Sequence, residues 1–327
     1  MRAAVWDLGS SSFHLLVCEV GPAGSLVPVM RRRALLNLGV AVGATGSIPV
    51  DRVAAAVAAT KRLRKTLDAH RPAVTVALAT AALRDASNGA TVVGRLERAI
   101  GTEVRVLDGP EEARLCFLGQ RAGVWTGERL SFGVDLGGGS LEVAVGDNHR
   151  VAFSTSVAVG AARLRGELGS GDPLTAREVA AVRARTAEAL MPVRADLRAY
   201  RGVTARAVVS GGTARALARL ATARARRRTT PEQGEVNQVE LPAEQVEELA
   251  GRLAGLDLAQ RRALPGVSAR RAPVLSIGAL ILASAAHVLE IERYVVSEWG
   301  LREGALIDEL TAQGLGSPWE AVAPTGR

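Results

Sequence analysis

The stretch VDLGGGSLEVAV, Val134–Val145, places an aspartate, three glycines and a glutamate between two short apolar segments. Short apolar runs with β-branched residues are typical of strands, and a glycine run between them is typical of a tight turn. The segment VWDLGSSSFHLLV, Val5–Val17, carries the same Asp-Leu-Gly-x-x-Ser core 128 residues earlier. This offset is too long for a solenoid repeat, so the two stretches predict a duplicated domain.

The segments that follow each hairpin alternate between strand-like and helix-like patterns. After the first hairpin, a helix is predicted over about 51–70, a strand over 73–80 and a helix from Pro110 to about Gln120. The pattern restarts near residue 130. Alternation of this kind indicates an α/β fold, and 327 residues are enough for two cores. We therefore expect one domain over 1–125, a second over 126–315 and a tail over 316–327.

The composition limits the class of partner. The net charge is +8, but all except two of the 41 basic residues are arginine, and aromatic residues make up only 3%. Without aromatic side chains on which bases could stack, we expect no nucleic-acid partner, whereas a different polyanion would suit the charge.

The apolar segment Ala272–Ile291 contains many small residues and several polar ones, so we expect a buried helix and no membrane partner. Cys18 and Cys116 are too few and too far apart for a disulfide framework, which favours the cytoplasm.

The two hairpin turns have the chemistry of phosphate-binding loops. Glycines leave backbone N–H groups open to an anion, and Ser12 and Ser140 add hydroxyl donors. Asp7 and Asp135 end buried strands, where an unpaired carboxylate is costly. A hydrated Mg²⁺ ion would satisfy both carboxylates, because it prefers one or two carboxylates together with water and phosphate oxygens.

The paired loops resemble the two phosphate loops of the actin-like ATPase superfamily, and more narrowly those of the exopolyphosphatase and guanosine pentaphosphate phosphatase family. The other motifs of that family appear in order between residues 2 and about 310: ATAALRDASN (79–88), DGPEEARLCFLG (108–119), SVAVGAARL (156–164), VVSGGTARALA (208–218), RRAPVLSIGALIL (270–282) and VSEWGLREG (296–304). The resemblance implies two actin-like (ribonuclease H-like) domains with a cleft between them.

By this resemblance Glu112 is the general base that activates water, and Glu142 is a second acidic candidate for metal or water. Glu111 and Glu112 could each instead serve as a favourable charge at a helix N-terminus. The implied metal ligands are Asp7, Asp135 and Glu142. The implied phosphate-binding residues are Gly9, Ser10, Ser11, Ser12, Arg84, Asn88, Gly137, Gly138, Gly139, Ser140, Gly211, Gly212 and Thr213.

Several of these positions have a simpler interpretation. Arg84 could be an ordinary surface arginine, and Thr213 could serve simply as the cap of its helix. His14 aligns with Glu142 and either faces the cleft or is a structural histidine. The run Arg224, Arg226, Arg227 and Arg228 is either a solvated helix end or a track for polyphosphate.

The sequence departs from the family pattern in the first loop, where Ser11 replaces the usual asparagine, and at Asn37, where a basic residue is common. The chain resembles short members that lack the C-terminal helical domain. We expect a Mg²⁺-dependent exopolyphosphatase, with the possibility of a homodimer. The alternatives are hydrolysis of guanosine pentaphosphate, with a link to the stringent response, and a non-catalytic sensor of either anion.

Overall fold

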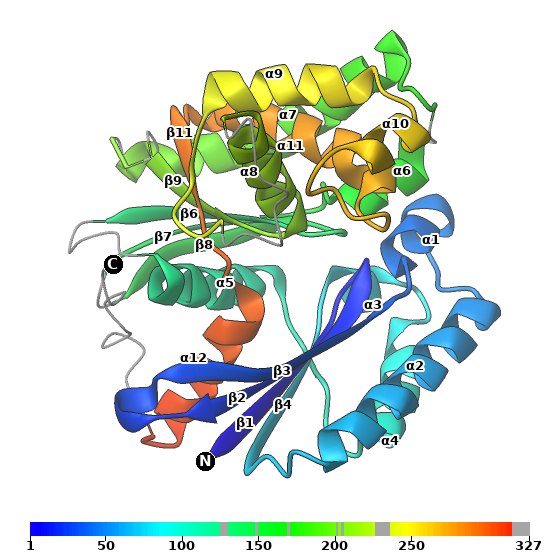
Figure 1. Ribbon diagram of the computed structural model, residues 1–327, viewed down its shortest axis with the longest axis vertical. Helices are drawn as coiled ribbons and strands as arrows, with labels where there is room; N and C mark the ends of the chain where they lie inside the picture. Colours follow the sequence, from blue (N-terminus) through cyan, green and yellow to red (C-terminus); the bar gives the residue numbers. More distant parts are fainter. Residues whose placement is uncertain are drawn as a thin grey trace.

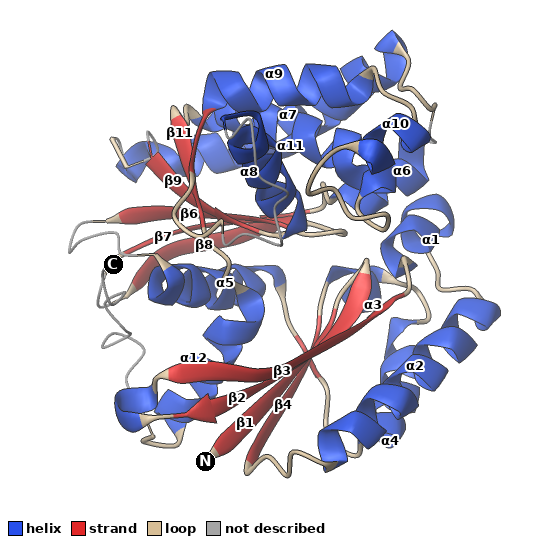
Figure 2. Cartoon of the chain, viewed as in Figure 1, coloured by secondary structure: helices blue, strands red, loops and turns tan. Residues whose placement is uncertain are grey.

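The computed structural model describes residues 1–124, 130–147, 150–168, 171–200, 202–203, 206–225 and 236–315. These residues form two mixed β-sheets with helices between them and on their outer faces (Figures 1 and 2). The predicted boundary near 125, the predicted tail over 316–327, and Arg226, Arg227 and Arg228 all lie outside the described residues, as does the side chain of Arg224.

The first sheet has the strand order β3-β2-β1-β4-β5. Its strands are β1 (Arg2–Leu8), β2 (Ser12–Val20), β3 (Leu26–Leu35), β4 (Val74–Ala79) and β5 (Arg105–Val106). The first three strands form an antiparallel meander, and β4 and β5 continue in parallel from β1. The meander contains the first predicted hairpin, with Asp7 directly opposite His14.

The second sheet repeats this order as β8-β7-β6-β9-β11 and adds β10 at its edge. Its strands are β6 (Ser131–Leu136), β7 (Leu141–Gly146), β8 (Val151–Val157), β9 (Arg206–Ser210), β10 (Glu240–Pro242) and β11 (Arg293–Val296). Asp135 lies opposite Glu142, as Asp7 lies opposite His14 in the first sheet. The shared order and register confirm the predicted α/β class and the duplicated architecture.

Helices cover the outer face of each sheet (Figure 1). The first sheet is covered by α2 (Val50–Asp68) and α4 (Gly89–Ile100), and the second by α7 (Ala176–Leu197), α8 (Gly212–Ala225), α9 (Ala243–Ala254) and α11 (Ala272–Leu289). The shorter elements are η1 (Pro22–Gly24), α1 (Leu38–Thr45), α3 (Ala81–Asp85), α6 (Ala161–Leu168), η2 (Arg198–Tyr200) and α10 (Leu258–Ala263).

The apolar helix α11 lies inside the second domain. It is long and apolar enough to cross a membrane, but 89% of it is buried in the protein. Leu275, Ile277 and Leu282 belong to the same core cluster as residues of the second sheet. The prediction of a buried helix over this segment is therefore confirmed.

Two further helices, α5 (Gly109–Gly123) and α12 (Leu301–Ala312), lie between the two sheets (Figure 1). α5 follows the first sheet in the chain but packs against β7 and β8 of the second. α12 is the last described helix, yet its Ala305 and Leu306 share a core cluster with Val5 of β1 and Leu115 of α5. Each half of the chain therefore sends one helix to the inner face of the other half's sheet.

Strand alternation decides which side chains face this central layer. On β1, Ala4, Trp6 and Leu8 pack toward α2 and α4, so Ala3, Val5 and Asp7 point the opposite way, toward α12. On β6, Val134 and Leu136 belong to the outer core, so Asp135 points inward, toward α5. The same rule directs His14 and Glu142 inward.

The sequence did not anticipate every element. Within the strand-like run TEVRVLDG (102–109), only Arg105–Val106 is paired, as β5. Cys18 and Cys116 are both free and buried, which agrees with the expected lack of a disulfide framework.

Candidate active site

The two glycine-rich loops meet at the junction between the sheets and pack directly against each other. A Cβ atom placed on Gly138 would lie 2.3 Å from Ser11 Oγ, and one placed on Gly139 would lie 2.3 Å from Ser10 Oγ. Neither distance is possible for a real Cβ atom. These two glycines are thus required by contact between the loops, whereas the sequence suggested only that they admit a phosphate.

The hydroxyl groups of the loops differ in their hydrogen bonding. Ser10 Oγ accepts a hydrogen bond from Ala82 N at 3.1 Å, Ser12 Oγ pairs with His14 Nε2 at 2.9 Å, and Ser140 bonds to Glu142. Ser11 Oγ is buried and has no hydrogen-bond partner within the described part of the chain. Among these loop serines, Ser11 therefore presents the hydroxyl whose bonding capacity is unused.

Asp7 and Asp135 face the same space from the two sheets, and each influences the charge state of this region. Burial raises the pKa of Asp7 to about 6; nearby Arg302 opposes this effect and Asp135 adds to it. Burial also raises the pKa of Asp135, although a hydrogen bond from Ser210 Oγ favours its ionised form. The two carboxylates are therefore held close together at an electrostatic cost that a cation would relieve.

Glu112 lies in the first turn of α5 and is almost fully buried. Asp108 caps this helix by accepting from Glu111 N at 2.8 Å, and the cap fixes where the first turn begins. Arg84 Nη1 donates to Glu112 Oε2 at 2.8 Å. Burial raises the pKa of Glu112 to about 7, even though Arg84 lowers it. A carboxylate with this pKa suits proton abstraction near neutral pH.

The neighbouring Glu111 points to the surface, where it lies 3.4 Å from Arg105. Of the two adjacent glutamates, only Glu112 reaches the central layer.

Glu142 lies near Glu112 and completes the acidic side of the site. Burial raises its pKa well above the usual range, and the charge of Glu112 adds to the effect. Ser156 Oγ donates to Glu142 Oε1 at 2.8 Å. Because two close buried carboxylates resist simultaneous ionisation, the pair holds a proton more readily than either residue would alone.

Part of the site, around His14, is strongly basic, and this was not predicted from the sequence. Four arginines form what we call the arginine cluster: Arg33 of β3, Arg215 of α8, Arg271 before α11 and Arg302 of α12. All four lower the pKa of His14, which burial already holds well below its ordinary value. His14 is therefore neutral, and its Nδ1 accepts from Arg302 Nη1 at 3.3 Å, since arginine can only donate.

The arginine cluster has too few anionic partners. Arg302 Nε lies 4.0 Å from Asp7 Oδ2, and Arg215 Nη1 donates to the Glu298 carbonyl at 3.5 Å. No carboxylate among the described residues pairs with Arg33 or Arg271. Burial, with smaller contributions from neighbouring arginines, lowers the pKa of Arg215 and of Arg271 to about 10. Arg33 and Arg271 are therefore positive charges that have no carboxylate partner in the described part of the chain.

The structure places some predicted phosphate ligands in other roles. Asn88 Nδ2 donates to the Ile48 carbonyl at 2.8 Å, and its Oδ1 accepts from Ile48 N at 3.0 Å, so this side chain fastens a loop and is not free to hold phosphate. Thr213 is fully buried against Gly278. Its hydroxyl has no partner in the described structure and faces a helix contact instead of the site.

The remaining predicted residues lie at or near the two loops. Gly9 contacts the Asp7 side chain, and Gly137 N bonds to the Ser140 carbonyl at 3.1 Å. Gly211 adopts a φ of 100°, which permits the turn into α8, and Gly212 lies directly beneath the Arg271 guanidinium. Arg84, predicted to clamp a phosphate, is instead bonded to Glu112 and to the Leu107 carbonyl.

The donor set fits the Mg²⁺ ion that the resemblance implies. Asp7 and Asp135 are inward-facing carboxylates with raised pKa values, and hard oxygen ligands are those that Mg²⁺ prefers. No group of three or more His, Cys, Asp or Glu residues is arranged to hold a metal within the described ranges. A site of two carboxylates completed by water and phosphate is consistent with both observations.

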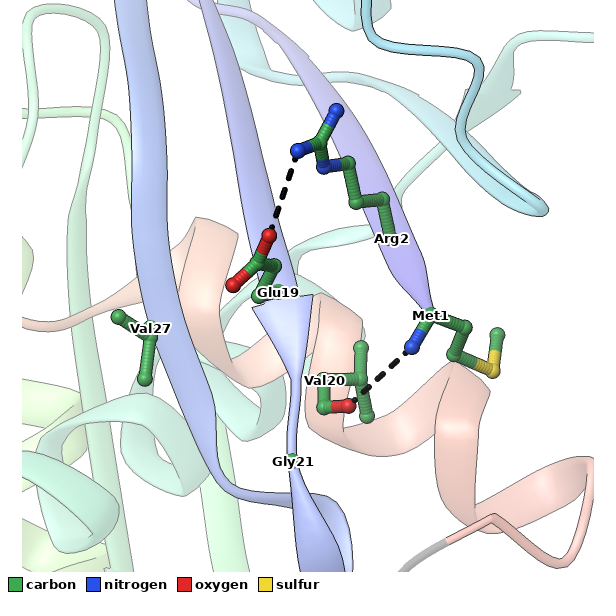
Figure 3. Close-up of a pocket in the computed structure, with 6 residues that line it drawn as sticks. All are labelled: Met1, Arg2, Glu19, Val20, Gly21 and Val27. Atoms are coloured by element: carbon green, nitrogen blue, oxygen red, sulfur yellow. Dashed lines mark hydrogen bonds and ion pairs between the residues drawn. The ribbon is translucent and has the colours of Figure 1, made fainter.

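A shallow hollow lies at the opposite end of β1 and β2 from the loops (Figure 3). It is lined by Met1, Arg2, Glu19, Val20, Gly21 and Val27. Arg2 and Glu19 form an exposed ion pair at 3.3 Å across it. The buried acidic and basic groups described above lie far from this hollow along the strands, so it is not part of the candidate site.

Comparisons with known proteins agree with this geometry. Residues 16–313 match the model of the Ppx/GppA phosphatase family. Exopolyphosphatase 1 of Mycobacterium tuberculosis is 33% identical over 323 residues, covering 97% of this chain and 90% of that protein. Exopolyphosphatase 2 of the same organism is 31% identical over 315 residues, covering 93% and 97%.

Solved structures share the fold along nearly the whole chain. An exopolyphosphatase from Cytophaga hutchinsonii superposes with a TM-score of 0.85 at 24% identity, covering 97% of this chain and 100% of that one. The Aquifex aeolicus member of the Ppx/GppA family superposes with a TM-score of 0.76 at 27% identity, covering 96% and 98%. The chain belongs to the Ppx/GppA phosphatase family and is a phosphoanhydride hydrolase.

Proposed function

We propose that this protein releases terminal orthophosphate from inorganic polyphosphate, with Glu112 as the general base for an attacking water. Relatives that are 31–33% identical along almost the whole chain are exopolyphosphatases, which supports this substrate class. The observation that carries the proposal is the arrangement of charge in the site. Glu112, a buried base, and the arginine cluster are separate groups that both act on Asp7 and Asp135: the two aspartates raise the pKa of Glu112, and Arg302 of the cluster lowers the pKa of both aspartates.

This arrangement suits a chain of phosphates. The terminal phosphoryl group would bind between the loops within reach of water activated by Glu112. The phosphates behind it would bind the arginine cluster and supply negative charge to Arg33 and Arg271. Phosphoryl transfer depends mainly on such positioning and charge neutralisation.

Asp7 and Asp135 are the residues that would hold Mg²⁺. When bound, the ion would neutralise charge on the substrate's phosphate oxygens and orient them. The protein's own groups have separate tasks: Glu112 takes the proton of the attacking water, Arg84 keeps that carboxylate in place, and the unpaired Ser11 hydroxyl donates to a phosphate oxygen.

Phosphate release from long polyphosphate, short polyphosphate and guanosine pentaphosphate tests the proposal, in the presence of Mg²⁺. We expect fastest release from polyphosphate. Glu112→Gln should lower kcat by about 10²–10⁴-fold, the usual contribution of a general base. Glu111→Gln is the matched control, because the adjacent side chain faces Arg105 at the surface, and it should leave kcat unchanged.

The other outcomes are equally informative. Equal rates for wild type and Glu112→Gln would refute the role of the base. Faster release from guanosine pentaphosphate than from polyphosphate would show that guanosine pentaphosphate is the preferred substrate. Binding of these anions without any release would favour the sensor hypothesis.

A further inference from the structure

A continuous series of side-chain contacts connects the second phosphate loop to Glu112. Arg163 of α6 donates from Nε to the Gly139 carbonyl at 2.8 Å. The other end of its guanidinium bonds to Asp85 of α3. Asp85 Oδ1 accepts from Arg84 Nε at 3.2 Å, and Arg84 Nη1 donates to Glu112 Oε2 at 2.8 Å. The series crosses from the second domain to the first at the contact between Arg163 and Asp85.

The first link is rigid because α6 begins on the second loop. Its backbone amides at Ala162 and Arg163 donate to the Gly138 carbonyl at 2.8 and 2.9 Å. Gly160, just before the helix, lies so close to the loop that a Cβ atom there would be 2.3 Å from the carbonyl carbons of Gly138 and Gly139. Arg163 therefore moves with the loop.

The second link, α3, is attached to the first loop. Ser10 Oγ accepts from Ala82 N at the start of this short helix, and Gly139 of the second loop lies against Ala81. Asp85 ends the same helix. Arg84 and Asp85 are therefore placed by both phosphate loops together.

Positive and negative side chains alternate along this series. Asp85 lies between the guanidinium groups of Arg84 and Arg163, and Arg84 lies between the carboxylates of Asp85 and Glu112. The side chains of Arg84, Arg163 and Glu112 are 23%, 13% and 7% exposed, so water screens these interactions only in part. Without Arg163, the negative charge of Asp85 would be balanced by Arg84 alone. Asp85 would then compete with Glu112 for the Arg84 guanidinium.

We propose that Arg163 is a positioning residue for the reaction: through Asp85 it holds Arg84 on Glu112, and it thereby couples the second phosphate loop to the general base. Substrate phosphate that orders this loop also orders the base. The inference rests on the proposed role of Glu112 as the base.

Crystal structures of two variants test the coupling without any assay of activity. In Arg163→Ala, Arg84 should turn toward Asp85, and its distance to Glu112 should exceed about 4 Å, the limit of an ion pair. Arg165→Ala is the matched control, because Arg165 lies on the same helix but donates to the Pro273 carbonyl within the second domain. It should leave the contact between Arg84 and Glu112 in place. An unchanged contact at 2.8 Å in Arg163→Ala would overturn the inference.

Steady-state kinetics with polyphosphate test the consequence. Arg163→Ala should lower kcat by about tenfold or more while KM changes less, because it disturbs the base more than binding. In an Arg84→Ala background the same substitution should have little further effect on kcat, since Arg163 acts through Arg84. An equal loss of kcat in both backgrounds would overturn the inference. If wild type released no phosphate from polyphosphate, the proposed function would fail, while the crystal structures would still decide the coupling.

Discussion

Arg84 lies 2.8 Å from Glu112, and both residues belong to the first half of the chain, although the site that they serve is formed by both halves. The basicity of the carboxylate is therefore set by two opposing effects. Burial raises the pKa of Glu112 to about 7, and Arg84 restrains the rise.

This balance predicts the pH dependence of the reaction. A general base works only when it is deprotonated, so kcat/KM should rise as the pH increases through about 7. Arg84→Met removes the restraining charge, so the rising limb should move upward by on the order of one unit. Activity of this variant should be lowest relative to wild type below pH 7 and recover partly at high pH. A limb that stays in place would show that Glu112 is not the titrating group.

The contact between the loops predicts an asymmetry between adjacent glycines. Gly138→Ala would place a Cβ atom 2.3 Å from Ser11 Oγ and 3.1 Å from Ser11 N, so the Ser11 hydroxyl must rotate and the two loops must shift slightly apart. At Gly137 the nearest atom would be 3.5 Å away, an ordinary contact. Gly138→Ala should therefore lower both the melting temperature and kcat/KM, whereas Gly137→Ala should preserve the melting temperature. Calorimetry and phosphate release would measure both, and equal effects would contradict the loop packing.

The buried carboxylates predict how stability changes with pH in the absence of metal. The pKa of Asp7 is raised from 3.8 to about 6, so the folded state holds a proton that the unfolded state has lost between these values. The free energy of unfolding should then fall as the pH rises from about 4 to about 6, by roughly 3 kcal/mol from this residue. Asp7→Asn should flatten the slope, as measured by urea denaturation at several pH values. If the variant showed the same slope, a titrating group other than Asp7 would be responsible for the pH dependence of stability.

Binding of Mg²⁺ should reverse this loss. At pH 7.5 the ion would bind the ionised forms of Asp7 and Asp135 in the folded state only, so it should raise the melting temperature. Asp7→Asn and Asp135→Asn should each abolish the rise. Asp51→Asn is the control, because this side chain is 79% exposed on α2 and should leave the rise intact. A rise that persists in both site variants would move the metal elsewhere.

The arginine cluster predicts a residue that serves binding at the expense of stability. Arg271→Gln should raise KM for polyphosphate about tenfold or more and weaken the dependence of KM on salt, with a smaller effect on kcat. Because the charge of Arg271 has no carboxylate partner among the described residues, its removal should not lower the melting temperature. Arg98→Gln, on the exposed side of α4, should change neither KM nor the melting temperature. A large loss of stability in Arg271→Gln would contradict the unpaired state.

The sequence predicted the parts of the site that depend on local pattern. The repeated Asp-Leu-Gly-x-x-Ser core was enough to predict both hairpins, the equivalence of His14 and Glu142 in the two copies, and the duplicated fold. The local pattern around Pro110 predicted that Glu111 and Glu112 open a helix, but only the family resemblance singled out Glu112 as the base.

Other features depended on which distant segments meet. The arginine cluster combines residues of β3, α8 and α12 with the residue before α11, and nothing in the spacing of these four arginines shows that they converge. Because the chain contains so many arginines, the sequence does not distinguish the few that lie in the site from those on the surface. Asn88 was assigned to phosphate for a similar reason, because its partner Ile48 lies 40 residues away.

The exchange of α5 and α12 has a consequence for the chain as a whole. Val5 on the inner face of the first sheet is covered by a helix from residues 301–312, and the inner face of the second sheet is covered by residues 109–123. A fragment ending near residue 124 would thus lose the α12 cover on the inner face of its own sheet, and it would expose the side of α5 that packs against β7 and β8. The two halves are therefore interlocked as in a domain-swapped pair joined into one polypeptide, and one of the two exchanged helices, α5, carries Glu112.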